Sequence, residues 1–231
     1  MFRRWREGDP TAMPDYVHDA MGVMAAKGDM DAALALVGTR RGPYTGVTVA
    51  AALVRKGDVR GARFALRGVR GWVNPGVAAA VWWASGQERH ARHLLARARQ
   101  EEVDVLGAMT LAAVLHRHGA DVGAVVREAF GDVLTDHVLV GLASGLHFEG
   151  AFAEAAAFAE RGTGRVAAFD AAGCWARAGD LDRALRWVAT AIDRGWDDPA
   201  ALDADDALAP LRAHPGWPAV RARLGPPSPP H

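Results

Sequence analysis

The stretch RVAAFDAAGCWARAGDLDRALRWVATAID, residues 165–193, decides the fold of this chain. It contains two segments rich in alanine, residues 165–178 and 181–193, on either side of the pair Gly179-Asp180. Glycine ends helices readily because it adopts the left-handed backbone conformation, and an aspartate directly after it can cap the next helix through its carboxylate. The stretch therefore predicts a helical hairpin, with one helix over 165–178 and a second over 181–193.

The same pattern recurs six times along the chain. The turn glycines are 29, 29, 33, 31 and 29 residues apart: Gly28, Gly57, Gly86, Gly119, Gly150 and Gly179. Five residues after each glycine stands an alanine: Ala33, Ala62, Ala91, Ala124, Ala155 and Ala184. Seven residues before each glycine the chain has Met21, Ala50, Ala79, Ala112, Ala143 and Ala172. Small residues at a helix crossing let two helices approach closely, so this recurrence predicts an all-α solenoid of about six helical hairpins.

Larger apolar residues recur between the small ones and are expected to fill the core. Four residues before each glycine the chain has Met24, Leu53, Trp82, Leu115, Leu146 and Trp175. Nine residues after the glycine four copies have Val37, Leu66, Leu95 and Val188. The fourth and fifth copies have Glu128 and Ala159 at that position, so they are the weakest copies. Asp29 and Asp58, like Asp180, are expected to cap the second helix of their hairpins.

This spacing resembles that of the tetratricopeptide repeat. The resemblance covers residues from about 15 to 196, and the last copy fits it best, with Ala172, Trp175, Gly179, Ala184, Val188 and Ala191. The segment from Ala191 to Trp217 also resembles the ending found on bacterial members of that family. The resemblance implies a right-handed α-α superhelix that binds proteins or peptides on its concave face. The period of mostly 29 residues is shorter than the family's 34, so the curvature stays open.

The expected organisation follows from the position of the repeats. We expect an N-terminal arm over 1–13, loosely packed or disordered, and a helical repeat domain over 14–196. C-terminal capping helices over 197–224 would cover the last apolar face with Leu202, Leu208, Leu211, Trp217, Val220 and Leu224. The proline-rich segment 225–231 cannot be helical and is expected to be a flexible tail that could reach the groove.

Composition excludes several classes of function. The chain has 27 basic and 27 acidic residues, so no charge excess favours nucleic-acid binding. The single cysteine, Cys174, lies in an apolar helical stretch and is expected to be a buried hydrophobic residue. No secretory leader or long apolar run is present, which predicts a soluble, cytoplasmic protein. Lysine occurs only at positions 27 and 56, a bias typical of GC-rich bacteria.

Motifs for catalysis or metal binding are missing from the sequence. No serine stands in a nucleophile-elbow motif, and no phosphate-binding loop occurs. His90 and His93, and His116 and His118 near Asp121, lack further ligands at metal-binding spacing. The acidic run from Asp193 to Asp206 lacks the glycine and terminal glutamate of a calcium loop. We therefore expect no enzyme activity, no metal and no cofactor.

Tryptophan offers an alternative from another class of function. Trp82, Trp83 and Trp175 could stack on bases in a helical-repeat nucleic-acid enzyme of the DNA glycosylase type. That alternative requires an exposed Trp83 beside an acid and a basic track on one face. Self-association of the chain is a third alternative.

The repeat spacing also marks positions expected on the concave face, namely two, three, six and ten residues before each glycine. These positions hold Val54, Arg55, Trp83, Met109, His116, Arg117, Val140, Ser144, His147, Phe148, Phe169 and Arg177. We hypothesise a groove for an acidic and apolar peptide, with the three arginines pairing carboxylates and the aromatic residues supplying apolar contact. A solvated face is the alternative. Family members that clamp a chaperone's C-terminal carboxylate use lysine and asparagine, which this chain lacks at these positions.

Overall fold

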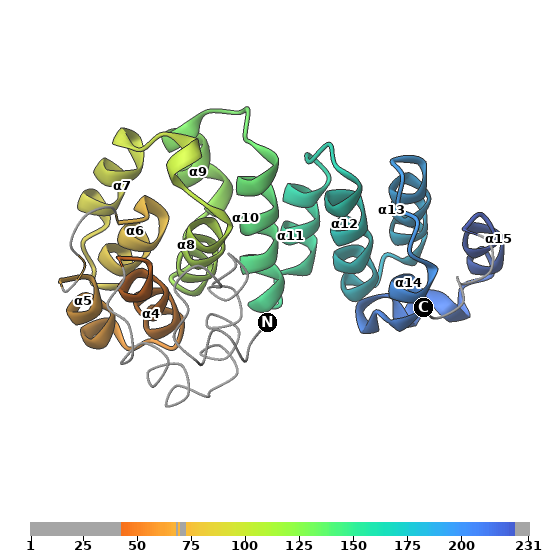
Figure 1. Ribbon diagram of the computed structural model, residues 1–231, viewed down its shortest axis with the longest axis horizontal. Coiled ribbons are helices and arrows are strands. Elements are labelled where there is room, and N and C mark those ends of the chain that lie inside the picture. The colour runs from red at the N-terminus through yellow and green to blue at the C-terminus, as the bar shows by residue number, and fades with distance from the viewer. Residues whose placement is uncertain (1–42, 68, 70–72, 225–231) are drawn as a thin grey trace, which may run out of the picture. The chain divides into compact units, whose positions relative to one another are not determined.

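The computed structural model describes residues 43–67, 69 and 73–224 (Figure 1). Within those residues the chain forms helices and turns and no strand, which confirms the all-α prediction. The first predicted copy, around Gly28, lies outside the described residues together with its cap Asp29. The predicted arm over 1–13 and the predicted tail over 225–231 also lie outside them.

The chain divides into two compact units, Met1–Arg97 and Ala98–His231, and the predicted repeat domain over 14–196 includes parts of both. We call them the N-terminal unit and the C-terminal unit. The described helices of the N-terminal unit are α4 (Pro43–Arg55), α5 (Val59–Arg67), α6 (Pro75–Ala84) and α7 (Glu88–Arg97). The C-terminal unit contains η2 (Gln100–Glu102), α8 (Val105–Arg117), α9 (Val122–Phe130), α10 (Asp136–Phe148), α11 (Phe152–Ala159), α12 (Arg165–Ala178), α13 (Leu181–Asp193), α14 (Pro199–Ala204), η3 (Asp206–Ala213) and α15 (Trp217–Ala222).

A glycine turn follows the first helix of every described hairpin, as predicted. The five glycines have φ between +69° and +87°. After α12, the N–H of Asp180 donates to the carbonyl of Trp175 at 3.0 Å, and after α10 the N–H of Ala151 donates to the carbonyl of Leu146 at 2.9 Å. This 6→1 bond is the Schellman motif, which satisfies a carbonyl at the helix end. The bounds of α12 and α13 are those predicted from the sequence.

Aspartate side chains cap two of the second helices at the predicted position, directly after the turn glycine. Asp180 accepts a hydrogen bond from the N–H of Arg183 at 2.9 Å, and Asp58 accepts one from the N–H of Gly61 at 2.8 Å. Both predicted caps are confirmed, and each satisfies a donor that the helix start leaves unpaired.

The recurring alanines pack inside the hairpins, with one exception. Nine of the described alanines at the two marked positions are at most 2% exposed: Ala50, Ala62, Ala79, Ala91, Ala112, Ala143, Ala155, Ala172 and Ala184. Ala124 is exposed, so the prediction is wrong there. The helix α9 starts one residue later than its counterparts, because its cap is Asp121 and Ala120 is an extra turn residue. Val125, 3% exposed, therefore occupies the buried position that the pattern assigned to Ala124. The same one-residue shift explains why the pattern position nine residues after the glycine holds the exposed Glu128 in this copy.

Close helix packing organises the C-terminal unit. Helix α8 packs on α10, α10 on α11 and α12, and α12 on α13 and η3. At the α8–α10 crossing a Cβ atom placed on Gly141 would lie 2.6 Å from the Cβ of Ala108, so only glycine fits this approach.

The end of this unit is covered by the segment expected to cap it. Four of its apolar side chains, Leu202, Leu208, Leu211 and Trp217, pack against residues of α12 and α13: Ala172, Ala176, Ala184 and Val188. Val220 and Leu224 are partly buried against the same cluster. None of the helices described combines the length and apolar character needed to cross a membrane.

Candidate functional site

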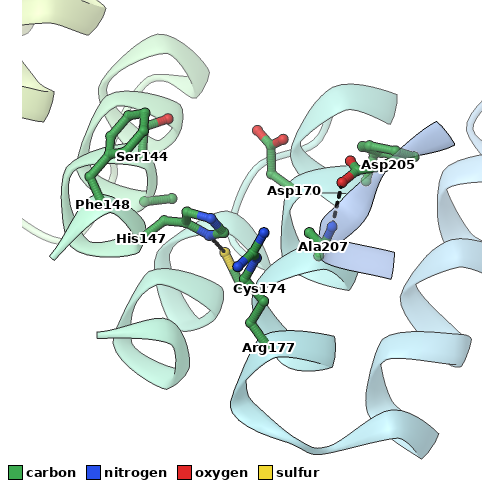
Figure 2. Close-up of a pocket in the computed structure, with 11 residues that line it drawn as sticks. Ser144, His147, Phe148, Asp170, Cys174, Arg177, Asp205 and Ala207 are labelled. Carbon is green, nitrogen blue, oxygen red and sulfur yellow. Dashed lines mark hydrogen bonds between the residues drawn. The ribbon is translucent and has the colours of Figure 1, made fainter. Parts of the chain in front are cut away.

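A pocket opens in the C-terminal unit between α10, α12 and the start of η3 (Figure 2). Its volume is about 240 Å³. Two aromatic rings, two carboxylates, an imidazole, a thiol and a guanidinium contribute to its wall. The lining residues are Ala143, Ser144, His147, Phe148, Phe169, Asp170, Gly173, Cys174, Arg177, Asp205 and Ala207.

Five residues that the repeat spacing marked line this pocket. Helix α10 contributes Ser144, His147 and Phe148, and α12 contributes Phe169 and Arg177. The two helices are the first helices of consecutive hairpins, and they pack on one another, so equivalent positions on them come together. The pocket makes these residues candidates for one site, and their binding of a ligand stays a prediction.

The marked residues of the N-terminal unit do not form such a surface. Trp83 is only 6% exposed and Val54 only 2%, so both belong to the interior. The guanidinium of Arg92 lies 5.0 Å from the centre of the Trp83 ring. Arg55 is half-buried. The position three residues before the glycine is thus a core position in these hairpins, and Trp83 has little surface to offer a ligand.

The remaining marked residues lie in the C-terminal unit away from the pocket lining. Arg117 donates from Nε to Glu149 at 2.7 Å and from a second nitrogen at 2.5 Å, and this bonding raises its pKa. His116 lies 3.7 Å from the carboxylate of Glu154. Met109 and Val140 are half-buried. The charge of Arg117 is therefore already paired within the protein.

Two carboxylates that the spacing did not mark change the charge of the pocket. Asp170 is half-buried on α12, and burial followed by the charge of Asp205 raises its pKa to about 6. Asp205 accepts a hydrogen bond from the N–H of Ala207 at 2.7 Å and so begins η3. The positions marked by the repeat spacing hold arginines and histidines but no acidic residue. The pocket, in contrast, contains both signs of charge.

His147 and Cys174 lie side by side in neutral form. The Nδ1 atom of His147 is 3.4 Å from the Sγ atom of Cys174. Burial raises the pKa of Cys174 to about 12, with a further contribution from Asp170. Burial and the charge of Arg177 lower the pKa of His147. A nucleophilic cysteine requires a thiolate, so this pair lacks the electrostatics of a cysteine catalyst. At 3% exposed, Cys174 is the buried residue that was predicted.

Aromatic rings form the apolar part of the pocket. Phe148 is 64% exposed, which is unusual for a large apolar side chain. Phe169 stacks on Trp196 with ring centres 4.1 Å apart and planes at 8°. The guanidinium of Arg177 lies 5.9 Å from the ring centre of Phe152. Phe169 is thus held by its stack on Trp196, and Phe148 packs edge-on against the ring of His147, with ring centres 6.2 Å apart and planes at 88°.

The spacing missed Asp170 and Cys174 for a different reason than Asp205 and Ala207. Asp170 and Cys174 each stand one residue after a position marked by the repeat spacing, namely ten and six residues before Gly179. Extending the marked set by one residue on α12 would have included them. Asp205 and Ala207 belong to the segment after the last repeat, where no periodicity exists to mark them.

The described residues contain no group of three or more histidine, cysteine, aspartate or glutamate side chains that could hold a metal ion. His90 instead packs its ring edge against Trp82, with centres 4.8 Å apart.

Comparison with known proteins adds no family to these observations. No protein-family model matches the chain, and no curated protein shows significant similarity to it.

Proposed function

We propose that this protein is a tetratricopeptide-like helical-repeat scaffold without enzymatic activity, and that its C-terminal unit binds a peptide segment of a partner protein across α10 and α12. The observation that carries the proposal is the pocket between these helices, where five residues marked by the repeat spacing come together. A partly exposed aromatic residue beside polar groups is typical of the centre of a protein-binding surface.

The packing of the hairpins supports the repeat-scaffold part of this proposal. In the C-terminal unit α8 packs on α10 and α10 packs on α12, and in the N-terminal unit α4 packs on α6. First helices of consecutive hairpins are therefore neighbours within each unit, as in a right-handed solenoid. The neutral thiol and imidazole in the pocket favour binding over catalysis.

Among the marked arginines, Arg177 is the one that still fits the predicted pairing with an acidic ligand. Within the part of the chain that is described, it has no ion pair within 4 Å, whereas Arg117 is occupied by Glu149. A ligand carboxylate or carbonyl is a suitable acceptor for its guanidinium. Phe148 would contact an apolar side chain of the same peptide.

The nucleic-acid alternative lacks a specific observation in its favour. It requires an exposed Trp83, which is 6% exposed, and a charge excess, which the balanced composition does not provide.

The proposal is tested by panning the whole protein against a phage-displayed library of random peptides and measuring the affinity of selected peptides by fluorescence anisotropy. Phe148→Ala is expected to weaken binding about tenfold or more, because hot-spot aromatic residues contribute that much. Phe64→Ala is the matched control, since Phe64 is 78% exposed on α5 and lies outside the pocket. It should leave the affinity unchanged.

Two results would overturn the proposal. One is that no peptide is enriched over a library panned without protein. The other is that the selected peptides bind the Phe148→Ala variant as tightly as the original chain, with circular dichroism showing equal helicity for both.

A further inference from the structure

Asp170 is an acid with no partner in the pocket wall. In the part of the chain that the structure covers, no group donates a hydrogen bond to its carboxylate and no cation lies within 4 Å of it. Its side chain is half-buried, so water compensates its charge only partly. The carboxylate of Asp205 lines the same pocket and acts on it as a like charge.

The basic residue of the pocket does not neutralise this pair. Arg177 forms no ion pair with Asp170 or Asp205, and its guanidinium lies against the ring of Phe152. Its charge acts instead on its other neighbours: it adds to the effect of burial in lowering the pKa of His147, and it offsets a small part of the rise that burial causes in the pKa of Cys174. Figure 2 shows Asp170 and Asp205 on one side of the pocket and the Arg177 side chain entering from below, beside Cys174. Opposite charges therefore stand in one small pocket without cancelling each other.

The two aromatic rings of the pocket lining suit an aliphatic chain or a flat cation. Phe148 is largely exposed and Phe169 is held by its stack on Trp196. Faces of aromatic rings attract cations, and the methylene groups of lysine and arginine pack well on them. At about 240 Å³ the pocket is below the range of typical small-molecule sites, about 300 Å³ and more, and its size fits one long side chain.

We propose that the pocket receives a basic side chain, lysine or arginine, of the bound peptide, with its cation between Asp170 and Asp205 and its stem against Phe148 and Phe169. The inference rests on the proposed function and names the residue type that this site selects. A cation at this place relieves the repulsion between the two carboxylates, which gives the ligand's charge a favourable interaction. Arg177 then faces an acceptor elsewhere on the same peptide.

The test uses N-acetyl-arginine methylamide as the probe and N-acetyl-citrulline methylamide as its neutral isostere. Both are titrated into the full-length ¹⁵N-labelled protein, and amide shifts are followed for residues 143–148, 169–177 and 205–207. The arginine compound should shift these amides and bind about tenfold more tightly than the citrulline compound, since the charge-assisted bond is lost in the isostere. N-acetyl-lysine methylamide tests whether an ammonium is also accepted.

Substitutions of the two carboxylates test whether they bind the cation of the arginine compound. Asp170→Asn and Asp205→Asn should each weaken binding of the arginine compound about tenfold. Asn keeps the capping oxygen at position 205, so η3 is retained. Asp197→Asn is the matched control, because that side chain is 89% exposed and outside the pocket lining. Equal binding of citrulline and arginine, no binding of either, or unchanged binding by both pocket variants would overturn the inference.

The library experiment separates this inference from the proposed function. Selected peptides that depend on Phe148 but contain no lysine or arginine would contradict the basic-side-chain inference and leave peptide binding standing. Binding of the arginine compound without any selected peptide would contradict the peptide-binding function and leave a site for small cations.

Discussion

Asp170 carries a charge that its surroundings disfavour, and this has a consequence for stability. Burial and Asp205 raise the pKa of its carboxyl to about 6 from 3.8 in the folded protein. The folded state therefore binds this proton more tightly than the unfolded state. The free energy of unfolding consequently falls as the pH rises from about 4 to about 6. We expect Asp170→Asn to raise the free energy of unfolding by about 3 kcal/mol near pH 8 and very little near pH 4.

Urea unfolding followed by circular dichroism at both pH values checks this prediction. The other ionisable groups in the pocket, His147, Cys174, Arg177 and Asp205, are the same in both proteins, so the difference reports on position 170 and its repulsion from Asp205. A loss of stability near pH 8 would mean that the carboxylate accepts a structural hydrogen bond, and the view of Asp170 as an unpaired acid would then be wrong.

Cys174 should be almost unreactive in the native protein. It is 3% exposed, and burial raises its pKa to about 12. Because the thiolate is the reacting species, we expect alkylation by iodoacetamide near neutral pH to be roughly 100-fold slower than that of glutathione. Mass spectrometry of timed samples measures the rate, and the same reaction in guanidinium chloride provides the control. Native labelling as fast as that of glutathione would return the Cys174–His147 pair to the candidates for nucleophilic chemistry.

At the scale of elements, local chemistry made the hairpins predictable and one inserted residue made a copy fail. The helix from Arg165 to Ala178 and the turn after it could be predicted because the glycine turn and the Asp180 cap depend only on neighbouring residues. Helix α9 has its cap one position later, and Ala124 matched the alanine pattern only by coincidence. Periodicity counts residues and does not detect such a shift.

The shift in α9 predicts opposite responses to the same substitution. Ala155→Glu places a charge at a position that is 0% exposed inside the α10–α11 hairpin and is expected to cost about 3 kcal/mol or more. Ala124→Glu occupies the equivalent position in the sequence pattern but is exposed, so we expect a change within about 0.5 kcal/mol. Chemical unfolding of both variants measures the difference. Similar losses for the two would show that the register of α9 follows the sequence pattern after all.

The candidate site shows why the sequence predicted only part of a binding surface. Ser144, His147 and Phe148 could be marked because α10 repeats the geometry of its neighbours. Trp83 was misplaced because its position on α6 faces the interior, which the spacing alone cannot distinguish from a groove. Asp205 comes from the capping segment, so its approach to α12 depends on tertiary packing that no repeat encodes.

For the whole molecule, the capping segment determines whether the last repeat ends in solvent or in a covered core. A stack of helical hairpins leaves an apolar face at each end, which must be covered to prevent association. In the C-terminal unit this cover is provided by residues of α14, η3 and α15, among which Leu202, Leu208 and Leu211 are 0% exposed. The same segment places Asp205 at the pocket, so capping and the proposed binding site share one element.

Leu208→Asp should therefore expose the end of the last hairpin and cause self-association. A carboxylate at this buried position is expected to cost about 4 kcal/mol or more, because it can be solvated only if η3 leaves the cluster around Ala172 and Val188. Size-exclusion chromatography with light scattering should show a higher mass than for the original chain at the same concentration. Ala209→Asp is the matched control, since the neighbouring side chain is exposed, and it should leave the mass unchanged. If Leu208→Asp keeps both the mass and the unfolding temperature of the original chain, η3 does not serve as the cover of the last repeat.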